Sequence, residues 1–253
     1  MARASLTQVV RYCDRVLQSE RFQDWDGAMN GLQAENSGVV TRIAAAVDGS
    51  LATIRLAVEA RADLLLVHHG LFWSRTQPWT GTRYQILRAL LDHNLAVYSS
   101  HLPLDAHASL GNNAQLCAAL GFKRLKPFFC TKGQCIGFKT EVALSREELC
   151  QRVSRAVALR PTLIPGGPST CRQIGVVSGA AGDDLAQAAA EGIDTFVTGE
   201  GRHWTYALAE DLGLNVVYAG HYATETFGVK ALAQRLSARF RVPWKFLDHP
   251  TGL

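Results

Sequence analysis

The chain has 253 residues, of which 47% are hydrophobic and 19% charged, a composition typical of a globular protein with a substantial core and not of a disordered one. The formal net charge of +4 comes from scattered basic residues, so no nucleic-acid duplex is implied as the main partner. The longest apolar runs are strand-sized, far short of the roughly 20 residues that span a bilayer, and the N-terminus lacks an apolar signal core, which together predict a cytoplasmic protein with no membrane partner.

Helices and strands alternate through the first half of the sequence. Leu6, Val9, Cys13 and Leu17 follow helical spacing after the capping-box sequence SLTQ at 5–8, which predicts a first helix. A loop rich in turn formers follows at 24–33. The later predicted elements are a strand at 39–47, a helix at 51–61, a strand at 64–67, a helix at 83–92, a strand at 96–99 and a helix at 112–120. This alternation predicts an α/β fold with a largely parallel or mixed sheet flanked by helices.

The segment from 126 to 173 changes character and predicts the entry into a second domain. A strand is expected at 135–144, and the capping-box sequence SREE at 145–148 opens a helix that runs to about Leu159. Pro161 and the PGGP turn at 165–168 end that helix. We therefore expect a first α/β domain at 1–125 and a second at 126–253.

The second half of the sequence resembles the first. Segment 43–70 superposes without gaps on segment 174–201, although few residues are identical, and segment 97–105 aligns with 217–225. In the latter pair each copy has a Val-Tyr strand end, then a histidine, then a carboxylate four residues later. The pattern predicts a pseudo-duplicated chain with two related domains, and chance repetition of two strand–helix units is the alternative.

The six cysteines do not form a recognisable framework. None belongs to a CxxC pair, and the nearest spacing, Cys130 to Cys135, has no second half. In a cytosolic protein we expect buried thiols, rather than a disulfide framework or a cysteine zinc site.

Four predicted strand ends carry histidine or a carboxylate where a structural turn needs only Gly, Ser or Asn. Ligands of open α/β sheets gather at the carboxyl ends of parallel strands. The four ends are HHG at 68–70, the stretch from His101 to Asp105, GEG at 199–201 and the stretch from His221 to Glu225. Imidazole and carboxylate groups suit Zn, Mn, Fe or Ni, and the sequence does not choose among these metals. The candidate ligands are His68, His69, Asp105, His221 and Glu225.

Each candidate also has a purely structural interpretation. His68 and His69 should point to opposite sides of their strand, so each can serve a different ion, or one can bind a metal while the other supports it. Two histidines satisfied by hydrogen bonds would look the same. His221 and Glu225 should share one helix face, with Glu225 bridging two ions; alternatively, Glu225 interacts with a helix dipole. Asp105 could be a turn or N-cap acid. The metal hypothesis rests on all these strand ends acting together.

The remaining histidines receive lesser roles. We expect His101 to be a proton donor or acceptor near the metal, and Glu200 to support a ligand or touch substrate. His107 and His203 are expected at the rim, and His93 and His249 on the surface. The sequence has no Walker A motif, no GxSxG elbow and no GxGxxG after the first strand.

Several motifs together resemble one family over nearly the whole chain. They are DGAMNGLQ at 26–33, VHHGLFW at 67–73, SHLPLD at 100–105, LGNN at 110–113, TGE at 198–200 and GHYATE at 220–225. These strings are similar to the NIF-three-like proteins, many of which are named GTP cyclohydrolase I type 2 homologues. The stretch GRHW at 201–204 departs from the family pattern, so substrate contacts there do not carry over.

The resemblance implies a two-domain α/β subunit with a dinuclear metal centre in the cleft between the domains, assembled as a toroidal homohexamer. Two divalent ions would be held by His68, His69, Asp105, His221 and Glu225, with Glu225 touching both. The function we expect is a hydrolase in which metal-bound hydroxide attacks a nucleotide-like substrate and His101 moves the proton. For a cyclohydrolase, the imidazole carbon of a guanine nucleotide would leave as formate. A phosphoester or pyrophosphate hydrolase, and a non-catalytic metal-binding assembly or regulatory protein, remain alternatives.

Overall fold

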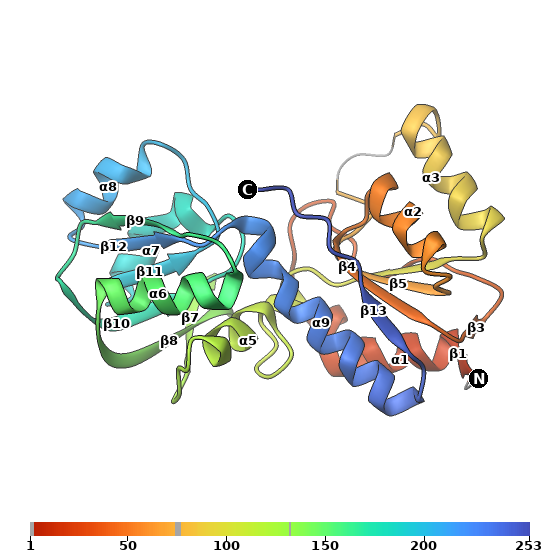
Figure 1. The fold of residues 1–253 in the computed structure, drawn as a ribbon, viewed down its shortest axis with the longest axis horizontal. Coiled ribbons are helices and arrows are strands. Elements are labelled where there is room, and N and C mark those ends of the chain that lie inside the picture. Colours follow the sequence, from red (N-terminus) through yellow and green to blue (C-terminus); the bar gives the residue numbers. More distant parts are fainter. Residues whose placement is uncertain (1–2, 74–76, 132) are drawn as a thin grey trace. The chain divides into compact units, whose positions relative to one another are not determined.

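A computed structural model describes residues 3–73, 77–131 and 133–253 (Figure 1). The chain forms two compact units. Unit 1 contains Met1–Leu104 and Gly228–His249, and unit 2 contains Asp105–Phe227 and Pro250–Leu253. These units differ from the division at 125/126 expected from the sequence. The residues from 105 to 125 pack in the core of unit 2, and the C-terminal strand joins the sheet of unit 1, pairings that no local pattern encodes.

The sheet of unit 1 has the strand order β13-β4-β5-β6-β2. The first four strands are parallel and β2 is antiparallel to β6. Their bounds are β13 Trp244–Phe246, β4 Ile43–Asp48, β5 Leu64–His69, β6 Ala96–Ser99 and β2 Gly31–Ala34. The strands β4, β5 and β6 are buried along nearly their whole length, as expected for parallel strands covered on both faces.

Helices cover both faces of this sheet. Figure 1 shows α2 (Leu51–Glu59) and α3 (Gly81–Asp92) on one face, and α1 (Leu6–Leu17) with α9 (His221–Phe240) on the other. The first face is built from alternating strand residues, including Ala44, Leu65 and Val97, which pack with Ile54 and Leu90 from the helices. Burial of these apolar side chains is the main stabilising term for unit 1.

Two helix starts differ from the expected capping. Ser5 precedes α1 but makes no side-chain cap bond, because Ser5 pairs with Val39 in the short antiparallel ladder of β1 (Ala4–Ser5) and β3 (Val39–Val40). A capping box forms instead at α2, where Ser50 and Thr53 bond each other's backbone. The strand predicted at 39–47 is split into β3 and β4.

The sheet of unit 2 has the order β7-β8-β10-β11-β12-β9, in which β10, β11 and β12 are parallel and the other pairs antiparallel. Strand bounds are β7 Lys126–Thr131, β8 Gln134–Ser145, β10 Thr170–Val176, β11 Thr195–Thr198, β12 Asn215–Tyr218 and β9 Thr162–Pro165. Unit 1 therefore contains four parallel strands and unit 2 three, and in each unit an antiparallel edge strand pairs with the last of them. The α/β fold with mixed sheets is confirmed, and the duplication stays a prediction.

The helices of unit 2 also lie on both faces of its sheet. One face packs with α5 (Asn112–Ala119) and α6 (Arg146–Val157), and the other with α7 (Leu185–Ala190) and α8 (Thr205–Asp211). Ser145 caps α6 as expected, since its hydroxyl accepts the Glu148 backbone N–H at 3.1 Å. The remaining short elements are η1 Ser19–Arg21, α4 Leu102–Asp105 and η2 Ala181–Asp184. No helix in the described parts of the chain is long and apolar enough to cross a membrane.

One expectation about the cysteines is wrong. Cys130 and Cys135 face each other across the β7–β8 hairpin and form a disulfide. The loop between these strands is so short that the two residues become a directly opposed cross-strand pair, which the sequence spacing alone did not reveal. Cys13, Cys117 and Cys171 are buried free thiols, as expected.

Candidate metal centre

In unit 1 the parallel strands deliver polar side chains to one edge of the sheet. Strand β4 ends at Asp48 and β5 at His69, and these two residues are direct neighbours in the ladder. Strand β6 ends at Ser99, two residues before His101. Because parallel strands end at the same edge, three sequence-distant segments meet there. We call His68, His69 and His101 the histidine cluster.

The three imidazoles of the histidine cluster converge. One ring nitrogen from each lies within 4.8 Å of those of the other two. The ring centroid of His68 lies 4.9 Å from that of His69 and 4.9 Å from that of His101. The expected divergence of His68 and His69 does not occur, because His69 is the last residue of its strand and its ring is drawn aside by Asp48. The spacing still allows His68 and His69 to serve different ions of a close pair, whose members lie roughly 3.5–4 Å apart.

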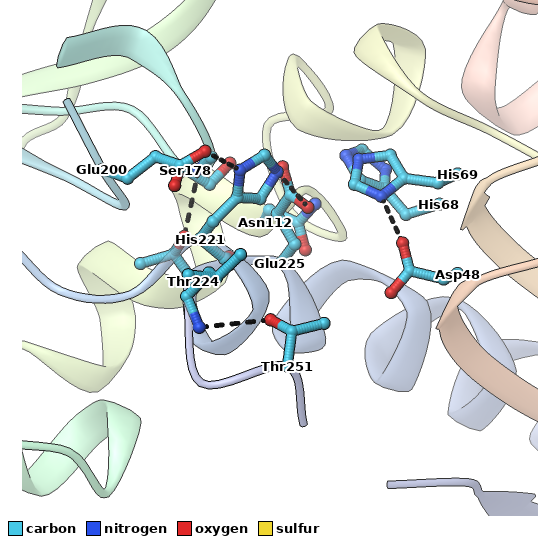
Figure 2. A network of polar contacts seen from close by, with 12 residues as sticks. Asp48, His68, His69, Asn112, Ser178, Glu200, His221, Thr224, Glu225 and Thr251 are labelled. Atoms are coloured by element: carbon cyan, nitrogen blue, oxygen red, sulfur yellow. Dashed lines mark hydrogen bonds and ion pairs between the residues drawn. The ribbon is translucent and has the colours of Figure 1, made fainter. Parts of the chain in front are cut away.

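Every ring in the histidine cluster is anchored through Nδ1. The His68 Nδ1 lies 2.9 Å from the Ser100 carbonyl oxygen, which can only accept, so Nδ1 carries the proton. The His69 Nδ1 lies 2.7 Å from Asp48 Oδ1, a contact visible in Figure 2, and the His101 Nδ1 lies 2.8 Å from Asp24 Oδ1. This is the usual support of metal-binding histidines, and Nε2 is then the nitrogen that would coordinate.

Asp24 holds His101 through a buried network. Its side chain is only 5% exposed, and it also accepts the Asn30 side-chain N–H at 2.8 Å and the Leu102 backbone N–H at 3.1 Å. Burial alone would raise the pKa of Asp24, but the hydrogen bond and charge of His101, with further donors, lower it overall. Asp24 is therefore an ionised carboxylate that fixes the ring of His101.

In unit 2 the start of α9 places His221 beside two carboxylates, as Figure 2 shows. The His221 Nδ1 lies 2.8 Å from Glu200 Oε1, and its Nε2 lies 3.1 Å from Glu225 Oε2 one helical turn later. Burial lowers the pKa of His221, but the hydrogen bonds and charges of Glu225 and Glu200 outweigh it and raise the pKa to about 9. The predicted sharing of one helix face by His221 and Glu225 is confirmed.

Glu225 is almost completely buried, with 3% exposure. It lies against Gly179, whose φ of +69° is in the left-handed region and whose missing Cβ leaves room for the Glu225 carboxylate. A carboxylate removed from water needs a compensating cation or donors. The neighbourhood of Glu225 is therefore shaped around its charge.

Asp105 is the third acid ligand candidate and is 5% exposed. Its Oδ1 accepts the Asn112 side-chain N–H at 2.8 Å and the Ser178 hydroxyl at 3.1 Å. The N-cap of α5 is Gly111, so Asp105 is not an N-cap acid. Both donors are neutral, which orients the carboxylate while leaving its charge intact. We call Asp105, His221 and Glu225 the carboxylate cluster.

The structure brings together the predicted histidines of unit 1, and in unit 2 it brings His221 together with Glu225. His68, His69 and His101 gather in unit 1, and His221, Glu225 and Glu200 in unit 2, where Asp105 has its own buried network. Their imidazole and carboxylate donors fit a divalent transition metal. The other histidines behave as expected: His93, His203 and His249 are exposed, and His107 is half-buried at a turn.

Sequence reasoning missed the residues that hold the ligands. Asp24 was assigned only to a turn-rich loop, although it lies just before the DGAMNGLQ motif. Asp48 closes strand β4 in the same way that His69 closes β5. The strand-end argument that found the histidines would have found Asp48, whereas only the folded contact identifies Asp24.

Comparisons with known proteins identify the family to which the chain belongs. A family model described as Duf34/NIF3 (NGG1p interacting factor 3) matches residues 4–251. A Deinococcus radiodurans protein named GTP cyclohydrolase 1 type 2 homolog is 40% identical over 97% of this chain and 94% of its own. A Halobacterium salinarum protein of the same name is 41% identical over 96% and 97%. The crystal structure of TTHA1606 from Thermus thermophilus is 40% identical, covers 99% of this chain and 100% of its own, and superposes with a TM-score of 0.91. The chain therefore belongs to the Duf34/NIF3 family.

Proposed function

We propose that the protein is a hydrolase that uses two divalent metal ions and acts on a nucleotide-like substrate. One observation carries the proposal: all four histidines of the two clusters are anchored through Nδ1 to an oxygen. The anchors are the Ser100 carbonyl, Asp48, Asp24 and Glu200, at 2.7–2.9 Å. Four histidines satisfied for structural reasons alone would have no reason to share one orientation, whereas metal ligation through Nε2 requires it.

In this proposal His68, His69, Asp105, His221 and Glu225, drawn from both clusters, would hold the two ions. The course of the chain supports this choice of ligands from both clusters. Two of the points at which the chain passes from one unit to the other, 104/105 and 227/228, lie at or near Asp105 and Glu225. The histidine cluster alone offers no carboxylate and the carboxylate cluster only one imidazole, whereas the two together offer the several imidazoles and carboxylates typical of a two-metal site.

When bound, a pair of divalent ions lowers the pKa of water to about 7 and polarises a substrate oxygen or nitrogen. His101 would move the proton at its Nε2, because Asp24 holds Nδ1 and thereby fixes which nitrogen faces the reacting groups. The His101 backbone N–H is held as well, by Asn30 Oδ1 at 2.7 Å. Asp24 and Asn30 are thus positioning residues for the proton carrier.

Nucleotides are the substrate class that the names of the relatives favour. A cyclohydrolase would open the imidazole ring of a guanine nucleotide and release formate, whereas a phosphoester or pyrophosphate hydrolase would release phosphate. Formate and phosphate assays on one reaction mixture therefore separate the two hydrolase alternatives.

The test combines metal analysis with turnover. Metal-loaded wild type is expected to release formate or phosphate from a nucleotide panel that includes GTP. His101→Ala should lose at least about 100-fold of this turnover while keeping its metal, because general acid–base catalysis contributes roughly 10²–10⁴-fold. His93→Ala, at an exposed histidine of the same unit, is the matched control and should keep full activity. Absence of turnover in the metal-loaded wild type would overturn the hydrolase proposal.

The convergence of the histidine cluster favours a second candidate, a metal-binding protein without catalysis. His101 offers a ring nitrogen within 4.8 Å of those of His68 and His69, so it could complete a three-histidine site as a ligand. In that case His101→Ala would release metal, whereas a proton carrier would leave metal content unchanged.

A further inference from the structure

Trp73 covers one side of the histidine cluster. Its ring centroid lies 4.8 Å from that of His101 and 5.2 Å from that of His69, with both imidazoles nearly perpendicular to the indole. Such edge-to-face contacts are favourable and hold the rings in fixed relative orientations. At the same time 38% of Trp73 remains exposed. The indole is therefore both part of the cluster and open to a ligand.

The chain around Trp73 is built to hold the indole in this place. Gln33 lies at an irregularity in the β2–β6 ladder, and its side chain accepts the Leu71 backbone N–H at 2.6 Å. The Trp73 Nε1–H donates to the Gly70 carbonyl at 2.8 Å. A Cβ at residue 70 would collide with the Gln33 side chain, so Gly70 permits this close approach. The turn after β5 thus places the indole against His69.

Four tryptophans have exposed side chains, and among them Trp73 contacts two imidazoles of the histidine cluster. Tryptophan is highly buried on average, and a supporting role for the imidazoles needs only the edges that touch them. Because Nε1–H already donates to the Gly70 carbonyl, the indole has no polar hydrogen left for a ligand and can offer it only aromatic surface. A flat aromatic ring is the ligand chemistry that such a surface recognises.

We propose that Trp73 is a specificity residue that stacks on the planar heteroaromatic ring of the substrate. The ligand class is a purine or similar base attached to a group that would reach the metal held by the histidine cluster. This inference rests on the proposed function for the reacting centre, whereas the stacking itself needs no turnover. It assigns base selection to unit 1.

The expected effect follows from the strength of base–aromatic stacking. Removal of one such contact weakens binding by about tenfold to a hundredfold. The loss should be confined to ligands that carry a ring, because phosphate groups gain nothing from an indole. Trp73→Phe should retain most of the affinity, since a smaller aromatic face remains.

The test is equilibrium binding to the metal-loaded full-length protein, with GTP and inorganic tripolyphosphate as the probes. The nucleotide is recovered after each measurement and checked to be intact. Wild type should bind GTP at least about tenfold more tightly than tripolyphosphate. Trp73→Leu should lose this preference while its affinity for tripolyphosphate and its metal content stay unchanged. The matched control is Trp79→Leu, at another exposed tryptophan of unit 1, which packs against Arg83; it should keep the preference.

Three outcomes would overturn the proposal. They are equal binding of both probes by wild type, an unchanged preference in Trp73→Leu, and an equal loss for both probes in Trp73→Leu. Ring-dependent binding without any turnover would instead overturn only the hydrolase proposal. If Trp73→Leu is unstable, Trp73→Phe and Trp73→His replace it, and a graded loss with decreasing aromatic surface is the expected result.

Discussion

The histidine cluster of unit 1 and the carboxylate cluster of unit 2 are built on the same plan with opposite chemistry. The histidine cluster lies where the parallel strands of unit 1 end, and His221 and Glu225 lie in the first turn of α9, which follows the parallel strand β12 of unit 2. In unit 1 imidazoles are the candidate ligands, and the carboxylates of Asp48 and Asp24 bind the Nδ1 atoms of His69 and His101. In unit 2 the carboxylates of Asp105 and Glu225 are candidate ligands, and neutral groups such as the Asn112 amide donate hydrogen bonds to Asp105.

This difference separates two tasks of a metal site. A carboxylate that accepts the Nδ1–H of an imidazole fixes the tautomer of the ring and raises the basicity of Nε2. A neutral amide or hydroxyl that donates a hydrogen bond to a carboxylate orients the carboxylate without cancelling its charge. We therefore expect the charge that attracts cations to come mainly from unit 2, and most of the imidazole nitrogens to come from unit 1. Substitutions in the two clusters should accordingly differ in size.

The largest effect is expected from Glu225→Gln. The substitution keeps the shape of the side chain but removes a buried charge that we assign to both ions. Metal content measured by elemental analysis after dialysis should fall from two ions per chain to one or none, with an affinity loss beyond the roughly 10–100-fold that supporting residues cause. Glu210→Gln, at an exposed position on α8, is the control. Full metal content in Glu225→Gln would remove Glu225 from the ligand set.

A smaller loss is expected from Asp48→Asn, which acts through His69. The amide cannot raise the basicity of the imidazole, so the affinity of one ion should drop by about 10–100-fold while the other remains. Competition titration with a chelator measures both affinities. Asp92→Asn, at an exposed residue paired with Arg88, should change neither. A loss of both ions in Asp48→Asn would argue against a separate role for unit 1.

Asn112→Ala should affect stability more than metal binding. It removes a buried donor to Asp105 and should lower the free energy of unfolding of the metal-free protein by about 1–3 kcal/mol. Ser178 still donates to Asp105 Oδ1, so the metal affinity should fall by no more than about tenfold. Denaturant titration with and without metal separates the two quantities. Unaltered stability would show that the amide is dispensable.

The smallest effect on metal is expected from the double variant Cys130→Ser, Cys135→Ser. The disulfide closes only the β7–β8 hairpin, and chain-entropy arguments give about 2 kcal/mol of stability for so short a loop. Metal content should be unchanged, as measured by elemental analysis. Loss of metal would mean that this hairpin supports the carboxylate cluster.

Much of the fold could be predicted because its signals are local. The spacing of Leu6, Val9 and Cys13 predicted α1, and the apolar runs before His68 and His101 predicted β5 and β6. The short strand β13 was not found, because its three residues carry no period and pair with β4 far away in the sequence. The same pairing explains why the units are not contiguous halves.

The candidate site was predictable to the extent that it lies at strand ends. His68, His69, His221 and Glu225 stand out there because such residues are unusual in structural turns. Asp24 does not stand out, since aspartate in a loop is ordinary and only its contact with His101 gives it a role. The convergence of His68 and His69 was also missed, because strand geometry fixes side-chain direction only within the strand.

Anomalous diffraction from crystals of the metal-loaded protein tests the central claim most directly. The account predicts two metal peaks per chain, with His68, His69 and His221 each bonded through Nε2 at about 2.0–2.1 Å while every Nδ1 keeps its oxygen partner. Metal bonded to Nδ1 of any of these histidines, or metal peaks only at other residues, would contradict it.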